Sequence, residues 1–289
     1  MEIAYSGDQA VAEMDTTSEN NQGTFGGGEA LTRLPQSGGE MISEAVRWGA
    51  RPLICLPLVA ALPETILDHA GRLAAMQPDI LEWRIDGYAE IDNIVSSMRL
   101  LDGIRRRIGA IPLLFTCRMS EEGGGAVVSA EHRLELLTAA IGSGNIDIVD
   151  TELANSVGFL ATVRQVARVQ NIPLLLSYHN FRQTPDEEVL LDILHRAVST
   201  GADIAKVAVM PNNAADVLTL FRVTNRARQA GIGVPLVTVA MGQIGMISRI
   251  AGGIFGSEIT FAAGLESSAP GQIPIAELRQ AMAPLYTFS

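Results

Sequence analysis

Cysteine and long apolar runs are both scarce in this sequence. Only two cysteines occur among 289 residues, and Cys55 and Cys117 lie in separate apolar runs. Two isolated cysteines in a chain of this length argue against a disulfide framework and against a cysteine metal site, and they fit a reducing compartment. No apolar run approaches the ~18 residues of a membrane span, and no basic-then-apolar leader opens the sequence. We therefore expect a cytoplasmic protein that does not bind a membrane.

Positive charge is also in short supply. The formal net charge is −11 at neutral pH. An acidic surface argues against nucleic acid and against anionic membranes as partners. A small anionic substrate stays possible, because a few arginines focused in a cleft can outweigh the bulk charge.

Most of the sequence shows a regular alternation of apolar and amphipathic segments. The first part is rich in Ser, Asp, Thr, Asn, Gln and Gly and has no hydrophobic period, so we predict a disordered N-terminal extension over residues 1–45. Residues 46–289 are predicted to form a single catalytic domain. The 47% hydrophobic content can supply one sizeable core.

Eight short apolar runs in this region predict buried strands. They cover residues 53–59, 80–85, 112–117, 146–152, 173–178, 204–209, 235–241 and 259–262. The stretches between them have the helical period. The predicted helices cover residues 64–76, 91–108, 130–141, 156–169, 186–200 and 214–230, with a short helix after Ile244 and a last one over 275–283.

Eight strands that are each followed by a helix favour a (β/α)8 TIM barrel, and the regular part has about the ~250 residues typical of that fold. The alternative is an open, doubly wound parallel sheet. Such a sheet usually has a glycine-rich phosphate turn after its first strand. Here that strand ends Pro57-Leu58-Val59-Ala60 without such a turn, which favours the barrel.

Charged or titratable residues recur toward the carboxyl ends of five neighbouring predicted strands, where barrel enzymes carry their chemistry. A charge in an apolar strand is costly unless it is paired or useful. A layer of structural salt bridges is the alternative explanation. The residues concerned are Glu82, Arg84 and Asp86, then Arg118, then Asp150 and Glu152, then His179, and finally Lys206.

Lys206 is the most informative of these residues. It is the only lysine among 21 basic residues, and it lies in the middle of an apolar strand, where lysine is rare. A buried lysine can lose its proton and attack a carbonyl, whereas arginine stays protonated. We therefore predict an amine nucleophile that forms a Schiff base with a ketone or an aldehyde. The alternative is a buried lysine that only pairs with Asp150 or Glu152.

His179 is the predicted partner of Lys206. It ends the preceding strand, so the two side chains should be neighbours at the barrel mouth. A histidine titrates near neutrality and can carry protons in both directions. The other three histidines lie on helical segments, where packing or surface roles are the simpler interpretation: His69, His132 and His195.

The last part of the predicted barrel supplies groups that could bind an anion. Arg249 follows the seventh strand, and a small polar segment over residues 264–272 follows the eighth. Such a segment suits a loop that closes over substrate. An arginine fork can bind a carboxylate with two hydrogen bonds. An ordinary turn around Pro270-Gly271 is the alternative.

These motifs, taken in order, resemble the type I 3-dehydroquinate dehydratase family over about residues 50–289. Each motif alone is weak, but the ordered series is highly specific. The series is Glu82-Trp83-Arg84-Ile85-Asp86, Thr116-Cys117-Arg118 with Glu122-Gly123-Gly124, Asp150-Thr151-Glu152-Leu153, Ser177-Tyr178-His179-Asn180-Phe181 with Thr184-Pro185, Lys206, Met241 to Arg249, Phe255-Gly256-Ser257 and Ser268-Ala269-Pro270-Gly271-Gln272.

The resemblance implies a (β/α)8 barrel that dehydrates 3-dehydroquinate reversibly to 3-dehydroshikimate in the shikimate pathway, as a homodimer without a metal or cofactor. It also implies the roles of the site residues. Lys206 would form the Schiff base, and His179 would be the general acid and base. Glu82, Arg84 and Arg118 would contact the ring hydroxyls. Arg249, Ser268 and Gln272 would surround the carboxylate, and the residues behind these would be Asp86, Glu122, Asp150, Met241 and Phe261.

Two other functions and one departure from the family pattern complete the expectations. A Schiff-base aldolase could use the same barrel, although such enzymes often carry a phosphate site after strands seven and eight. A quinate-type binding protein without activity is the other alternative. The departure is Asn180, where many family members have Asp, and it could change the tuning of His179.

Overall fold

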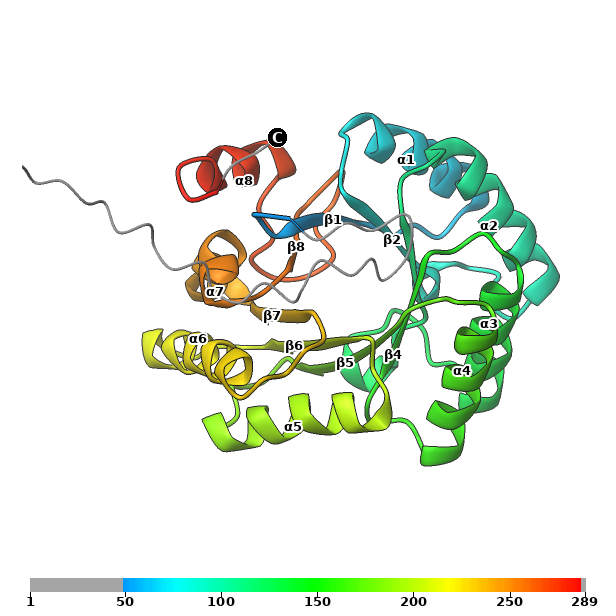
Figure 1. Cartoon of the computed structure of the whole chain (residues 1–289). Coiled ribbons are helices and arrows are strands. Elements are labelled where there is room, and N and C mark those ends of the chain that lie inside the picture. Colours follow the sequence, from blue (N-terminus) through cyan, green and yellow to red (C-terminus); the bar gives the residue numbers. More distant parts are fainter. Residues whose placement is uncertain (1–48, 287–289) are drawn as a thin grey trace, which may run out of the picture. The chain divides into compact units, whose positions relative to one another are not determined.

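The computed structural model describes residues 49–286, and in that range eight parallel strands with their helices form a (β/α)8 barrel (Figure 1). The predicted fold class is confirmed. The hydrogen-bonded strand order is β7-β6-β5-β4-β3-β2-β1-β8. A parallel bridge between Leu236 and Ser257 joins the two ends of this order. The predicted extension over residues 1–45 and its boundary lie outside the described residues.

The predicted strands agree with the observed bounds to within two residues at each end. The strands are β1 (Leu53–Leu58), β2 (Ile80–Arg84), β3 (Leu113–Thr116), β4 (Ile148–Glu152), β5 (Leu174–Asn180), β6 (Ile204–Val209), β7 (Leu236–Ala240) and β8 (Ile259–Phe261). Because β5 continues to Asn180, His179 lies on a strand rather than just after one.

The helices also follow the predicted periods. They are α1 (Pro63–Ala75), α2 (Ile94–Ile108), α3 (Ala130–Gly142), α4 (Val157–Val169), α5 (Glu187–Thr200), α6 (Ala214–Gln229), α7 (Gly242–Ala251) and α8 (Ile275–Met282). Three short 3-10 turns accompany them: η1 (Ile85–Gly87), η2 (Ser120–Glu122) and η3 (Gly252–Phe255). Helix α7 begins at Gly242, before the position predicted for it.

Side-chain caps explain where several helices start. The α2 helix begins at Ile94, three residues later than predicted, because the Asn93 side chain accepts a hydrogen bond of 3.0 Å from the Ser96 amide. Ser129, Ser156 and Asn213 cap α3, α4 and α6 in the same way. Each cap satisfies an amide that would otherwise have no partner inside the helix.

Acidic residues tie the strands together at the amino end of the barrel. An acid directly before each even-numbered strand accepts a hydrogen bond from an amide near the start of the preceding odd-numbered strand. Because this end lies opposite the carboxyl ends of the strands, these acids stabilise the barrel away from its chemistry. The four acids are Asp79, Asp147, Asp203 and Glu258.

Two apolar cores lie on the two faces of the sheet. The larger one packs the outward-facing strand residues against the helices. The smaller one fills the barrel interior, where side chains from alternate strand positions meet. Its floor is formed by Ile80, Leu114, Ile148, Leu175, Ile204, Val237 and Ile259.

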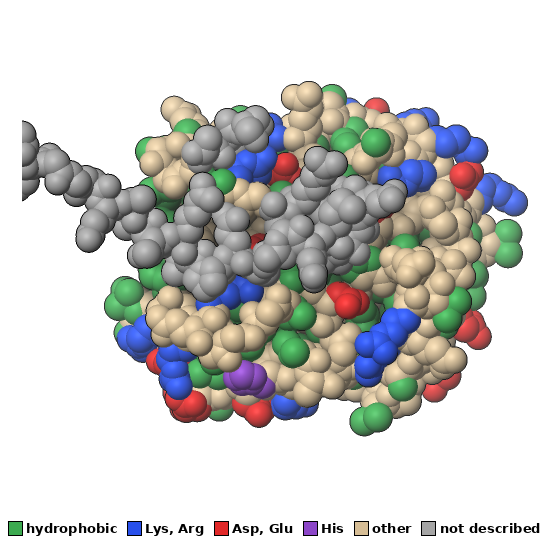
Figure 2. Space-filling view, in the orientation of Figure 1, with side chains coloured by type: hydrophobic (Ala, Val, Ile, Leu, Met, Phe, Trp, Pro, Cys, Tyr) green, Lys and Arg blue, Asp and Glu red, His purple; other side chains and the backbone are tan. Residues whose placement is uncertain are grey.

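Charged side chains of both signs are scattered over the visible outer surface (Figure 2). This distribution is ordinary for a globular enzyme and marks no single charged face in this view. Among the helices of residues 49–286, none combines the length and the apolar character needed to cross a bilayer.

Candidate active site

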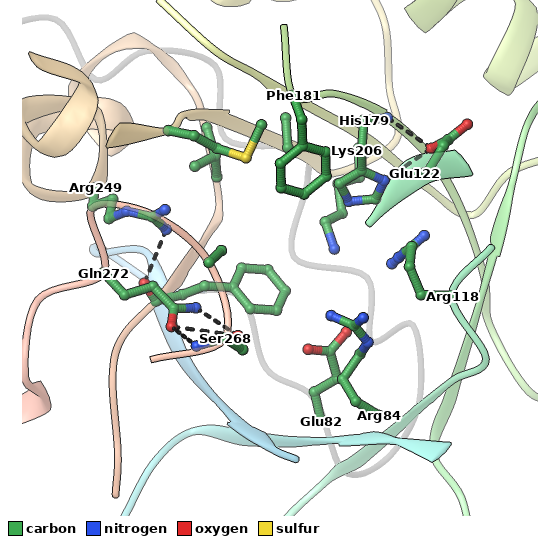
Figure 3. Close-up of a pocket in the computed structure, with 15 residues that line it drawn as sticks. Glu82, Arg84, Arg118, Glu122, His179, Phe181, Lys206, Arg249, Ser268 and Gln272 are labelled. Carbon is green, nitrogen blue, oxygen red and sulfur yellow. Dashed lines mark hydrogen bonds and ion pairs between the residues drawn. The ribbon is translucent and has the colours of Figure 1, made fainter. Parts of the chain in front are cut away.

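A pocket opens at the carboxyl ends of the strands (Figure 3). Strand residues two positions beyond the floor point to the same side, because strand side chains alternate. On β2, β4 and β6 these residues are Glu82, Asp150 and Lys206. The pocket is lined by Glu82, Arg84, Arg118, Glu122, His179, Phe181, Lys206, Ala208, Val239, Met241, Arg249, Phe261, Ser268, Ala269 and Gln272.

Lys206 is buried in the strand and presents its amine to this pocket. The side chain is 6% exposed, and its Nζ lies 3.4 Å from Oδ2 of Asp150. On another side, Nζ stands 4.4 Å from the centre of the Phe261 ring. In the described part of the chain, the amine thus makes one ion pair and one cation–π contact, and Lys206 lines the pocket.

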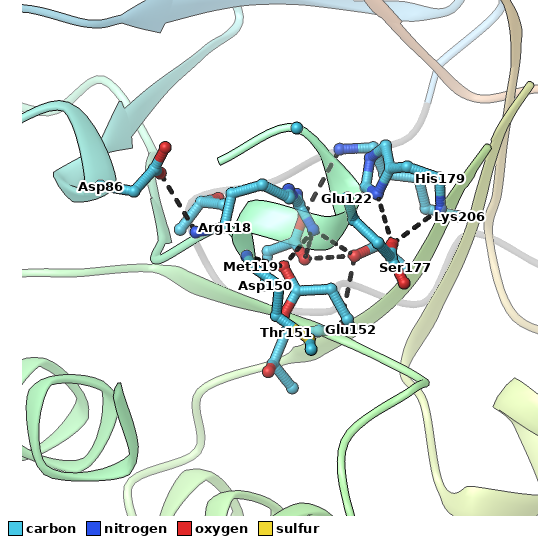
Figure 4. A network of polar contacts seen from close by, with 12 residues as sticks. Asp86, Arg118, Met119, Glu122, Asp150, Thr151, Glu152, Ser177, His179 and Lys206 are labelled. Carbon is cyan, nitrogen blue, oxygen red and sulfur yellow. Dashed lines mark hydrogen bonds and ion pairs between the residues drawn. The ribbon is translucent and has the colours of Figure 1, made fainter. Parts of the chain in front are cut away.

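Asp150 also holds Arg118 (Figure 4). Nη2 of Arg118 donates a hydrogen bond of 2.7 Å to Asp150, and Nη1 donates one of 2.7 Å to Glu152. The hydroxyl of Ser177 also donates a hydrogen bond of 2.6 Å to Asp150. Burial alone opposes the charged form of Asp150, but Arg118 and Lys206 outweigh it and lower the pKa of Asp150 to about 2. Asp150 is therefore ionised at neutral pH.

Glu152 extends the same network away from the pocket. Arg133 of α3 donates a hydrogen bond of 3.0 Å to its second oxygen. A structural salt-bridge layer, the alternative considered from the sequence, thus exists around Glu152. It does not account for Lys206, which has a single, longer ion pair with Asp150 and lines the pocket.

His179 is fixed by Glu122, which the η2 turn brings over the end of β5. The backbone amide of His179 donates a hydrogen bond of 2.8 Å to Oε2 of Glu122, and Nδ1 lies 3.0 Å from the same oxygen. Because that oxygen already accepts from the amide, we assign the ring proton to Nδ1. Nε2 then carries the lone pair that can accept a proton.

The pKa values of these two side chains move in opposite directions. Burial, followed by the charges of Arg118, Lys206 and Arg84, holds the pKa of His179 well below its usual range. Burial, followed by the nearby Glu152, raises the pKa of Glu122 to about 7. His179 is therefore neutral at neutral pH, as a general base must be.

Arg84 reaches the pocket from the end of β2. Its guanidinium makes two hydrogen bonds to Asp86, of 2.8 Å and 2.7 Å. Although burial opposes the charge, this carboxylate raises the pKa of Arg84. Asp86 lies on η1 rather than on the strand, and it also accepts from the backbone amides of Arg118 and Gly125. It therefore joins the ends of β2 and β3.

Arg249 stands on the opposite side of the pocket and differs from the other arginines. Its Nη1 and Nη2 donate to the carbonyls of Phe261 and Pro270, both at 3.1 Å. Its Nε has no partner among the described residues. Burial lowers the pKa of Arg249 to about 10, and no described carboxylate forms an ion pair with it. A buried cation of this kind favours an external anion.

The segment predicted to close over substrate is folded back on itself beside Arg249. The amide of Ser268 donates a hydrogen bond of 2.8 Å to Oε1 of Gln272, and Nε2 of Gln272 donates one of 3.0 Å to Oγ of Ser268. Gly271, in this segment, has a φ of +76°. A Cβ there would lie 2.2 Å from the Gly242 carbonyl oxygen, so the turn requires glycine.

The structure brings together all eight residues predicted to act on or bind substrate, since each lines the pocket. Glu122, Met241 and Phe261, which were expected behind them, also line it. Asp86 and Asp150 do not line it but contact residues that do, namely Arg84, Arg118 and Lys206. Sequence reasoning gave no role to Phe181, Ala208, Val239 or Ala269. Phe181 could have been found as the aromatic residue that follows the His179 strand end.

Asn180, the departure from the family pattern, does not touch the His179 ring in any described contact. Its amide donates a hydrogen bond of 3.1 Å to the Tyr178 hydroxyl, and its oxygen accepts from the amides of Arg182 and Gln183. Asn180 thus stabilises the turn that follows β5. An aspartate at this position could accept the same two backbone hydrogen bonds.

Fold and pocket together define a barrel enzyme with a buried lysine, a neutral histidine and an arginine that favours an anion. The model of the family described as type I 3-dehydroquinase matches residues 54–288. A 3-dehydroquinate dehydratase of Geobacillus thermodenitrificans is 42% identical over 83% of this chain and 93% of its own length. One of Albidiferax ferrireducens is 40% identical over 83% of this chain and 90% of its own.

Solved structures of 3-dehydroquinate dehydratases are also similar to this chain. The 3-dehydroquinate dehydratase of Geobacillus kaustophilus superposes with a TM-score of 0.81 at 42% identity, covering 83% of this chain and 93% of that one. The type I enzyme of Clostridium difficile, solved with covalent modified comenic acid, gives 0.81 at 35% identity, with 83% and 95% covered. The chain belongs to the type I 3-dehydroquinase family and is a hydro-lyase, which confirms the resemblance and argues against the aldolase alternative.

The raised pKa of Glu122 predicts a pH-dependent stability. Because folded Glu122 keeps its proton to about pH 7, the folded state binds more protons than the unfolded one between about pH 4.5 and 7, and stability falls as pH rises through that window. Glu122→Gln removes this titration. Relative to the parent protein, its unfolding free energy should increase by about 2–3 kcal/mol from pH 5 to pH 8.

Chemical denaturation at the two pH values measures this difference. Glu121→Gln is the matched control, because Glu121 lies on the same turn but is exposed. A gap between Glu122→Gln and the parent that stays constant with pH would contradict the raised pKa.

Proposed function

We propose that this enzyme dehydrates 3-dehydroquinate reversibly to 3-dehydroshikimate through a Schiff base on Lys206, as a cytoplasmic step of the shikimate pathway. The observation that carries the proposal is the pairing of one buried amine with a neutral imidazole in the same pocket (Figure 3). The solved relative from Clostridium difficile, described with covalent modified comenic acid, supports covalent chemistry in this family.

The reaction begins when the Lys206 ammonium gives a proton to Nε2 of His179 and the neutral Nζ attacks the substrate ketone. The carbinolamine hydroxyl takes this proton back from His179 and leaves as water, which forms a cationic iminium. An iminium withdraws electrons more strongly than a ketone, so the proton on the adjacent carbon becomes more acidic. Nε2 of His179 removes that proton and gives an enamine. The enamine expels the β-hydroxyl, which takes a proton from His179 and departs as water. Hydrolysis of the conjugated iminium then releases product and restores the amine.

The substrate carboxylate would bind Arg249. Within residues 49–286, its Nε has no hydrogen-bond partner and no carboxylate pairs with it, which leaves a buried positive charge that a carboxylate can neutralise. Ser268 and Gln272 would complete this end of the pocket by exchanging their mutual hydrogen bonds for bonds to the ligand. Such exchange would let the segment respond to substrate without a large movement.

The ring hydroxyls would lie on the opposite wall. Glu82 accepts one hydrogen bond, of 2.9 Å, from Thr116, which leaves a carboxylate oxygen for a substrate hydroxyl. Arg84 and Arg118 would donate to hydroxyl oxygens with the hydrogens that their carboxylate partners do not use. Two anchors at opposite ends would orient the ketone toward Lys206, and orientation of this kind lowers the barrier.

Borohydride trapping tests the Schiff base directly. Incubation with 3-dehydroquinate and borohydride should add the reduced ligand to one residue, and peptide mass analysis should locate it at Lys206. Lys206→Met, which keeps an unbranched apolar chain, should show no adduct and no measurable turnover. Comenic acid should modify the same residue.

A second variant separates covalent binding from proton transfer. His179→Ala should still form the trapped adduct, while its kcat falls by about 10²–10⁴, the usual size of positioned proton transfer. The Schiff-base mechanism is wrong if Lys206→Met keeps near-normal turnover. The acid–base role of His179 is wrong if His179→Ala keeps the parent kcat.

Arg249→Met should raise the KM for 3-dehydroquinate by about 10–100-fold, since a hydrogen bond to a charged group is worth about 1.5–3 kcal/mol. Arg249→Lys keeps the positive charge and should raise KM by a smaller factor. Steady-state kinetics measure both, and thermal unfolding checks that the barrel is intact. If Arg249→Met binds substrate as tightly as the parent protein, the carboxylate is bound elsewhere.

We also propose that the enzyme is a homodimer. Exposed isoleucines on α7 and η3 support a contact surface there: Ile244 is 50% exposed, Ile247 46% and Ile254 45%. Light scattering should give about twice the chain mass of 30.8 kDa, and Ile247→Asp should shift it toward the monomer. A parent protein that scatters as a single chain would exclude the dimer.

A further inference from the structure

Phe261 at the end of β8 touches both ends of the pocket. Its ring faces Lys206, with Nζ 4.4 Å from the ring centre. Its backbone carbonyl accepts a hydrogen bond of 3.1 Å from Nη1 of Arg249. We propose that Phe261 is a positioning residue that sets the spacing between the reactive amine and the carboxylate-binding guanidinium, and that its ring holds the cationic nitrogen during the reaction. This inference rests on the function proposed above.

The position of Phe261 is fixed because the residues before and after it in the chain are both hydrogen-bonded to neighbouring elements. In the register of β1 and β8 it lies opposite Cys55, and the next amide, of Ala262, donates a hydrogen bond of 3.0 Å to the Cys55 carbonyl. The preceding Thr260 donates one of 2.9 Å to the Arg249 carbonyl. Phe261 itself is buried. Movement of its ring or carbonyl would therefore require the strand to move.

The Phe261 ring can attract the charge on the Lys206 nitrogen without a hydrogen bond, whereas the Asp150 carboxylate binds through an N–H group. Asp150 attracts the ammonium through an N–H group. In the iminium, the same nitrogen keeps its positive charge but has a single hydrogen left, so it can donate fewer hydrogen bonds. An aromatic face attracts the charge itself and needs no N–H group. Because the iminium has fewer N–H groups for Asp150, it depends on the ring more than the ammonium does, so Phe261 favours formation of the covalent bond.

Simple packing is the alternative explanation for a phenyl ring at this position. The neighbouring wall of the pocket is aliphatic, with Ala208, Val239 and Met241. Filling space there does not require an aromatic ring. A leucine would keep the apolar volume and the backbone carbonyl but remove the π face, so Phe261→Leu separates the two explanations, and Phe261→Tyr restores the face.

The experiment compares these variants with the parent protein by borohydride trapping with 3-dehydroquinate and by steady-state kinetics. Phe261→Leu should lower the trapping rate and kcat about tenfold, within the range of a desolvated cation–π contact, while KM changes less than about twofold because Arg249 keeps its carbonyl partner. Phe261→Tyr should recover both rates to within about threefold. Phe115→Leu is the control, because it removes a buried phenyl ring that packs outside the barrel against Trp83.

The outcomes separate this inference from the proposed function. If the parent protein is trapped and Phe261→Leu is trapped and turns over at the same rate, the ring only fills space and the inference is overturned alone. The same follows if Phe261→Leu and Phe261→Tyr behave alike, or if KM rises while kcat is unchanged. A parent protein that never forms the adduct overturns the Schiff base and this inference with it.

Discussion

The carboxylate of Asp150 is the group on which the rest of the pocket depends. It is buried in the barrel interior, and it pairs there with Arg118 and Lys206. A buried carboxylate is stable only with such partners, and removal of one partner from a buried pair typically costs about 3–5 kcal/mol. Asp150 thus allows a lysine to be placed in an apolar strand, and the same contact aims the amine at the pocket.

The arginines of the pocket divide into two kinds according to their partners. Arg118 and Arg84 are each paired with a carboxylate, which keeps them charged and rigid. Arg249 binds only backbone carbonyls in the described part of the chain, and its charge is left for a ligand. For the proposed substrate this arrangement favours one orientation, because its carboxylate would be attracted to Arg249, whereas Arg84 and Arg118 beside Glu82 already have carboxylate partners.

The sequence was enough to predict the barrel, its strands and the residues that meet at the mouth, because alternation and burial are local properties of each strand. It also identified Lys206, since a single lysine in an apolar strand needs a reason. It left open whether Lys206 pairs with Asp150 or with Glu152, because parallel strands are staggered around a closed barrel, and the structure shows Asp150. The reach of Glu122 to His179 and the double contact of Phe261 likewise depend on how a turn and a strand end are placed in space.

The electrostatics of the pocket suit a histidine that must both accept and return a proton. Burial and three nearby cations already keep His179 neutral, so its Nε2 is ready as a base. In the proposed mechanism the nitrogen on Lys206 is a neutral enamine once His179 has taken the proton. The imidazolium then stands near the charges of Arg118 and Arg84, which make it a stronger acid than an ordinary histidine. Glu122, with its pKa of about 7, steadies the imidazolium without trapping the proton. The same charges thus favour both halves of the elimination.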